Sequence, residues 1–140
     1  MNYLLGVALV ILGYDVWFYI FHRTLHLPRF YWIHKIHHKP RYLEMTYRDA
    51  QEGHMIENLL NYFGNFVSWI VLYPQISWSH VIGGASYCGI RSLVHHDHNL
   101  TNYKILRILG GTKHHLRHHQ NTNVNYGVWW IDYLCCTNYK

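Results

Sequence analysis

Four short histidine clusters place the strongest constraint on how this chain can fold. They are the segments 22–26 (HRTLH), 34–38 (HKIHH), 95–98 (HHDH) and 114–119 (HHLRHH). On a helix, residues three and four positions apart share a face, so each cluster directs two or three imidazole rings the same way. Neutral imidazole is a good ligand for iron, zinc and copper. The clusters therefore predict a metal site assembled from distant parts of the chain.

The number of histidines favours two metal ions. The first, second and fourth clusters supply eight well-spaced candidate ligands, and the third cluster adds one to three more. These candidates are His22, His26, His34, His37, His38, His115, His118 and His119, followed by His95, His96 and His98. A tetrahedral zinc site uses four ligands, so the set suffices for a pair of ions. A structural zinc cluster is the alternative, although such clusters usually recruit thiolates, and a bis-histidine haem site would need only two residues.

One long apolar run, at residues 3–21, precedes the first cluster, and two more, at 55–73 and 76–94, lie between the second and third clusters. Nineteen helical residues extend about 28 Å, close to the hydrocarbon thickness of a bilayer. A cleavable signal peptide would need a basic start and a small-residue cleavage site, and the first run has neither, so we expect a retained span. The other two runs, joined at Pro74, predict an antiparallel helical hairpin in the membrane, with a buried soluble hairpin as the alternative. Gly83 and Gly84 are small enough to let helices approach closely.

Three spans would bring every histidine cluster to one side of the membrane. Lys and Arg lie on that same side or at its boundary, whereas residues 1–2 and 73–79 contain none. Cytoplasmic loops carry the excess of basic residues, so the histidines are expected to face the cytosol. We therefore predict one all-α domain over residues 1–140, an integral membrane bundle of about three spans with a cytosolic histidine-rich helical cap.

The remaining features are less specific. Short helices are expected at residues 30–38 and 104–109, and residues 128–136 could form a strand or a short helix. The net charge of +5 is not arranged as a nucleic-acid stripe. The three cysteines form no CxxC pair and predict no disulfide framework. Asp15 lies seven residues before His22, on the same helical stripe, where it could accept the second ring N–H of a ligand histidine and fix its tautomer.

The order of these motifs resembles the fatty acid hydroxylase/sterol desaturase superfamily. HRxxH, HxxHH, a histidine pair after a hairpin and HHxxHH are followed by Asn125-Tyr126-Gly127 and by the WxDxL motif at residues 130–134. The resemblance implies a helical membrane enzyme with a histidine-ligated di-iron centre. Such enzymes use O2 and two electrons, ultimately from NAD(P)H, to hydroxylate or desaturate an unactivated C–H bond of a fatty-acyl, sterol or carotenoid-like lipid. Cytochrome b5 or a ferredoxin-type protein is the expected electron donor.

The resemblance carries the eight well-spaced histidines over as metal ligands, with His54 and Asp132 as candidates to lie behind them. The third cluster departs from the pattern, because Arg91 stands where some members have a histidine. His96 or His98 could replace it, or one metal could be short of a ligand. Two other functions stay open: a catalytically silent membrane metal-binding protein that keeps the fold, and a histidine-rich zinc protein.

Overall fold

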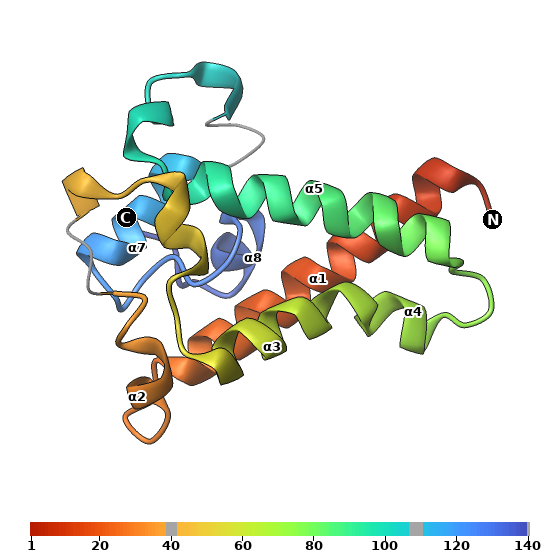
Figure 1. Ribbon diagram of the computed structural model, residues 1–140, viewed down its shortest axis with the longest axis horizontal. Coiled ribbons are helices and arrows are strands. Elements are labelled where there is room, and N and C mark those ends of the chain that lie inside the picture. Colours follow the sequence, from red (N-terminus) through yellow and green to blue (C-terminus); the bar gives the residue numbers. More distant parts are fainter. Residues whose placement is uncertain (39–41, 107–110, 140) are drawn as a thin grey trace.

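The computed structural model describes residues 1–38, 42–106 and 111–139, and all regular structure in these ranges is helical (Figure 1). The longest helix, α1 (Tyr3–Leu25), begins at Asn2, whose side chain accepts a hydrogen bond from the backbone N–H of Leu4 at 2.9 Å. Of the described helices, α1 is the one whose length and apolar composition suffice to cross a membrane. The prediction of an all-α fold is confirmed for the described residues.

The predicted hairpin is present, but its first arm is interrupted. Helix α3 (Met55–Phe63) is followed by the 3-10 turn η3 (Gly64–Phe66) and by α4 (Val67–Val71). The interruption lies where the chain crosses α1, since a Cβ on Gly64 would stand 2.6 Å from the Trp17 ring. The second arm is the continuous helix α5 (Trp78–His96). Because the first arm is broken, the arrangement with three spans remains a prediction.

Helices α1 and α5 pack closely in their N-terminal halves. A Cβ on Gly84 would collide with the side chain of Val10, which is fully buried together with Ile76 and Val81. The absence of a side chain at Gly84 therefore lets the two helices approach, as the small residues predicted.

The remaining elements gather at the C-terminal ends of α1 and α5 (Figure 1). They are α2 (Tyr31–His34), η1 (Tyr42–Glu44), η2 (Tyr47–Gln51), η4 (His98–Leu100), α7 (Thr112–Gln120) and α8 (Trp129–Leu134). The helix predicted for residues 30–38 is shorter than expected, because turns follow His34. Residues 128–136 adopt the helical alternative as α8. Of the helix predicted at 104–109, residues 104–106 are helical and the rest lie outside the described residues.

Candidate metal centre

Nine histidines converge into two groups at this end of the molecule. In each group every residue offers one ring nitrogen, and these nitrogens all lie within 4.8 Å of one another. The first histidine group contains His22, His26, His34, His38 and His118. The second histidine group contains His37, His96, His115 and His119. The groups draw on all four clusters, so tertiary structure rather than local spacing brings the rings together.

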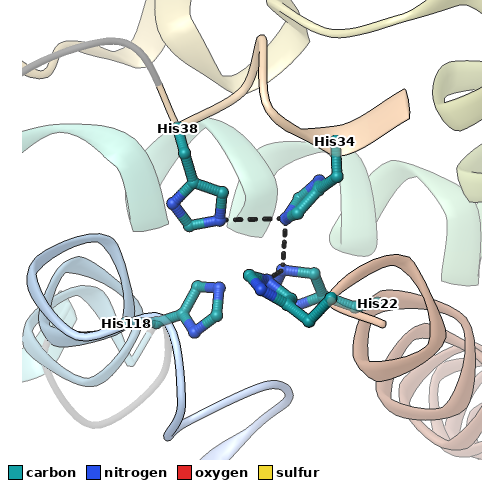
Figure 2. A group of neighbouring side chains, drawn as sticks. His22, His34, His38 and His118 are labelled. Carbon is teal, nitrogen blue, oxygen red and sulfur yellow. Dashed lines mark hydrogen bonds between the residues drawn. The ribbon is translucent and has the colours of Figure 1, made fainter. Parts of the chain in front are cut away.

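Helix ends and turns position the first histidine group. His22 lies in the last turn of α1, His26 caps that helix, and His34 ends α2. His118 comes from the last turn of α7, on the opposite side of the group (Figure 2). In Figure 2 the labelled rings point toward a common centre. The Nε2 atom of His34 lies 3.0 Å from Nε2 of His22 and 2.9 Å from Nε2 of His38.

The second histidine group is built in the same way from the turn after α2, the end of α5 and helix α7. Nε2 of His96 lies 3.0 Å from Nε2 of His37 and 2.9 Å from Nε2 of His115, and Nε2 of His119 lies 3.2 Å from that of His115. Two imidazole nitrogens that each lie about 2.1 Å from a shared ion would be separated by about 3.0–3.4 Å for angles between 90° and tetrahedral. The spacing in both groups suits shared metal coordination.

The hydrogen bonds that Nδ1 makes show which ring nitrogen of each histidine is free to bind a cation. Nδ1 of His96 donates to the carbonyl of Ser92 at 2.7 Å, and Nδ1 of His37 donates to that of Glu52 at 3.1 Å. A carbonyl can only accept, so both Nδ1 atoms carry the proton and both Nε2 atoms of the neutral rings present lone pairs. Two lone pairs facing each other at 3.0 Å repel, unless a cation lies between them.

His118 shows the same pattern in the first histidine group. Its Nδ1 donates to the carbonyl of Val124 at 2.7 Å, while its buried Nε2 has no hydrogen-bond partner among the described residues. Protonation does not supply the missing partner of these ring nitrogens. Burial, and after it the neighbouring histidines, lowers the pKa of His118 to about 3 and that of His38 to about 2. These residues fit metal ions better than protons.

Comparison with known proteins agrees with this geometry. A family model described as fatty acid hydroxylase matches residues 7–137. The chain belongs to the fatty acid hydroxylase family. The resemblance inferred from the histidine motifs is thereby confirmed. No solved structure matches the chain.

Within this fatty acid hydroxylase fold, the 95–98 cluster is divided among three environments. His96 joins the second histidine group. His95 stacks on His115 with ring centroids 5.6 Å apart, but it belongs to neither group. His98 lies against the ring of Tyr42, at a centroid distance of 5.2 Å. Of the two residues expected to replace the missing histidine at Arg91, His96 is therefore the one placed to do so.

Contrary to the expectation from the sequence, Asp15 does not contact a candidate ligand histidine. Its carboxylate accepts a hydrogen bond from the guanidinium of Arg91, and both side chains are buried. His54 also lies away from the groups, where its Nδ1 accepts from the backbone N–H of Ile56 at the start of α3. The partner of Asp15 is thus an arginine on the facing helix α5, which compensates the charge of the buried carboxylate.

Asp132 supports the first histidine group through the backbone. Its carboxylate is fully buried and accepts hydrogen bonds from the backbone N–H groups of Tyr126 and Gly127 at 2.9 and 2.8 Å. The Tyr126 carbonyl in turn accepts from Nδ1 of His22. Asp132 also bonds to Nε2 of His114 at 2.9 Å, which accounts for the place of His114 outside both groups. Asp132 thus lies behind the site, as proposed from the WxDxL motif.

Glu57 is the supporting residue that sequence reasoning missed. Its Oε1 lies 2.6 Å from Nδ1 of His34, which places a carboxylate directly behind a candidate ligand. Such carboxylate–histidine pairs fix the tautomer and make the ring a stronger ligand. The signal in the sequence was the single acid in the apolar run 55–73.

A cavity lies beside the two histidine groups. His22, His34, His96 and His115 line one part of it, and Phe18 and Phe21 of α1 line another. The aromatic residues provide an apolar wall next to the candidate metal ligands. This arrangement places apolar side chains directly beside the candidate metal ligands.

Proposed function

We propose that the protein is a membrane-bound, O2-dependent oxidoreductase that hydroxylates or desaturates an unactivated C–H bond of a fatty-acyl, sterol or carotenoid-like lipid. The observation that carries this proposal is the convergence of nine imidazoles into two adjacent groups, in which His37, His96 and His118 direct the lone pairs of Nε2 inward. In this proposal each group holds one iron ion. Iron bound in this way supplies O2 activation and the one-electron chemistry that C–H cleavage requires.

The protein's own residues orient and enclose the site. Glu57 and the carbonyls of Glu52 and Ser92 hold the protons on Nδ1, so that the Nε2 atoms of their partner histidines remain available to the metal. The aromatic wall at Phe18 and Phe21 receives the hydrocarbon. In this mechanism no side chain acts as a nucleophile.

Membrane attachment is part of the proposal. Helix α1 has the length and composition of a span, and it ends at His22 and His26. The metal site would therefore lie at the membrane boundary, where a lipid chain can reach it without leaving the bilayer. The distribution of basic residues favours a cytosolic orientation for that side, at the membrane of the endoplasmic reticulum or at a bacterial inner membrane.

An electron donor, such as cytochrome b5 or a ferredoxin, has a candidate docking surface on α7. Lys104, Lys113 and Arg117 line a groove on the outer side of this helix. Helix α7 buries His115 and His118 on its other side. We call the groove lined by these three cations the basic groove. One helix thickness would separate a donor bound there from the metals, and an acidic donor would be attracted to it.

The decisive experiment is metal analysis combined with turnover of the purified protein in lipid nanodiscs. We expect two irons per chain, and lipid oxidation that requires O2, NAD(P)H and an electron-transfer protein. Iron without turnover under any donor would support the silent metal-binding alternative. Zinc alone, in a protein that purifies without detergent, would support the histidine-rich zinc protein.

A further inference from the structure

A second cavity lies between α1, α5 and α8, and it has a volume of about 200 Å3. Its walls include Ile11, Trp129 and Trp130, and Trp129 is exposed, so the cavity reaches the surface beside α8. Two polar side chains, Arg91 and His95, line both this cavity and the one beside the histidine groups. The two spaces therefore lie next to each other, with these two residues between them.

Arg91 is held rigidly at this junction. It is 8% exposed, it donates a hydrogen bond to Asp15, and its guanidinium lies 5.8 and 5.4 Å from the ring centroids of Tyr14 and Tyr87. A guanidinium carries five N–H donors, more than this carboxylate contact uses. A buried arginine fixed in this way can offer a donor to an incoming oxygen atom with little loss of side-chain entropy.

His95 supplies the complementary polar atom. It follows Arg91 by four residues on α5, so the two side chains share a helix face. Its buried Nε2 has no hydrogen-bond partner among the described residues. A buried polar atom left in this state costs free energy, which a ligand that bonds to it would recover.

The charges around the junction favour a neutral ligand. The positive charge of Arg91 is compensated by Asp15, so this ion pair offers a carboxylate no net attraction that would offset the cost of burying its charge. A hydroxyl group fits better, because it can accept from Arg91 while it also bonds to Nε2 of His95 in either tautomer. We propose that Arg91 and His95 anchor the hydroxyl end of a long-chain neutral lipid, whose hydrocarbon extends into the cavities. This inference rests on the proposed function, since it describes the substrate of that site.

Ligand binding without turnover tests the anchor. The iron-loaded, oxidised protein in nanodiscs, with no electron donor, is titrated with tritiated 1-hexadecanol and competed with unlabelled hexadecanol, hexadecane or hexadecanoate. A hydrogen bond to a charged donor predicts that the alcohol binds at least about tenfold more tightly than the alkane, with the carboxylate weaker than the alcohol. Equal binding of alcohol and alkane would overturn the inference, and so would preference for the carboxylate.

A double variant separates the anchor from a merely structural ion pair. Asp15→Asn with Arg91→Gln removes both charges together, so no unpaired ion is left buried. We expect the alcohol-over-alkane ratio to fall to within about twofold of one, because the charged donor is lost, while iron content is retained. An unchanged ratio with a lower melting temperature would assign the pair to stability alone.

A second pair of variants keeps the test available if the double variant does not fold. Ile11→Trp fills the cavity and leaves both charged residues in place, and Leu12→Trp makes the same change at an exposed neighbouring position. Hexadecanol binding should weaken at least about tenfold in the first and stay constant in the second, because only the first occupies the ligand's space. Equal binding in both variants would contradict the proposal.

The outcomes also distinguish this inference from the proposed function. A strong preference for hexadecanol in a protein that neither holds iron nor oxidises lipid would retain the binding site and refute the oxygenase. Iron and turnover without that preference would remove the anchor alone.

Discussion

His96 and His98 lie two residues apart in the sequence and yet have different surroundings. Helix α5 ends at His96, and Asp97 adopts an extended conformation with ψ 106°, which turns the chain away. His96 consequently faces His37 and His115, whereas His98 faces Tyr42. A change of backbone direction at one residue thus decides which imidazole reaches the second histidine group.

This difference predicts opposite results for two matched substitutions. His96→Ala should lower the iron content from about two to about one per chain and abolish lipid oxidation, because one group loses a ligand. His98→Ala should keep both irons and near wild-type turnover. Iron is counted by elemental mass spectrometry after removal of weakly bound metal. Full iron content in the His96 variant would exclude that residue as a ligand.

Glu57 illustrates how a residue behind the site can matter as much as a ligand. Its removal leaves Nδ1 of the buried His34 without its acceptor. We expect Glu57→Ala to weaken iron binding in the first histidine group by about 10–100-fold, and Glu57→Gln to have a smaller effect, because an amide oxygen can still accept. The measurement is iron retention against a chelator series. Identical retention in the wild type and both variants would show that the contact with His34 does not support the metal.

At the scale of the helices, α1 and α5 depend on the absence of side chains at their crossing. Gly84 of α5 lies against Val10, whereas a Cβ on Gly89 of the same helix would meet nothing within 4 Å. Both glycines lie on α5 and can be replaced by the same residue, alanine, but they differ in their surroundings. Comparing the two substitutions therefore separates the effect of helix propensity from the effect of helix packing.

We expect Gly84→Ala to destabilise the protein by about 1–3 kcal/mol, because the new methyl group forces the helices apart. Gly89→Ala should be neutral or stabilising by up to about 1 kcal/mol, since alanine is the better helix former. Thermal unfolding in detergent, with iron content as a second readout, measures both. A stable Gly84 variant with the native iron content would mean that α1 and α5 can shift without disturbing the site.

At the scale of the whole molecule, the two sides of α7 carry different kinds of residues. Its inner side supplies three of the nine candidate ligands, and its outer side contributes Lys113 and Arg117 to the basic groove. Helices α1 and α5 meanwhile present exposed apolar residues along their length, such as Leu4, Leu12, Ile82 and Ile90. The molecule thus has an apolar body and a histidine-rich end with basic residues on its outer surface, which is the division that the proposed membrane enzyme and its proposed electron donor would need.

The basic groove predicts a charge-dependent encounter with an acidic electron donor. Lys113→Glu combined with Arg117→Glu should slow reduction by an acidic ferredoxin at low ionic strength by about tenfold or more, with the effect diminishing as salt is added. Arg29→Glu, which changes an exposed cation outside the groove, serves as the control. Reduction is followed by stopped-flow absorbance. Equal slowing in all variants would indicate a general charge effect and no specific docking surface.

The histidine spacing and the apolar runs were enough to predict the helical class and a hairpin with small residues that let helices approach, and to name every histidine that the two groups contain. These features depend on helix periodicity and on hydrophobic burial, which are encoded locally. The break in the first arm was less predictable, because it lies at Gly64, where the chain packs against Trp17 of a helix far away in the sequence.

Only the tertiary structure decided how the ligands divide between the two groups, and which acids support them. The pairing of Asp15 with Arg91 instead of a histidine, and of Glu57 with His34, depends on which side chains meet across separate helices. Buried charges and ring N–H groups must find partners wherever the packing brings them together, and such partners can lie far away in the chain. The sequence by itself determined which chemistry was possible, and long-range packing determined the atoms that carry it out.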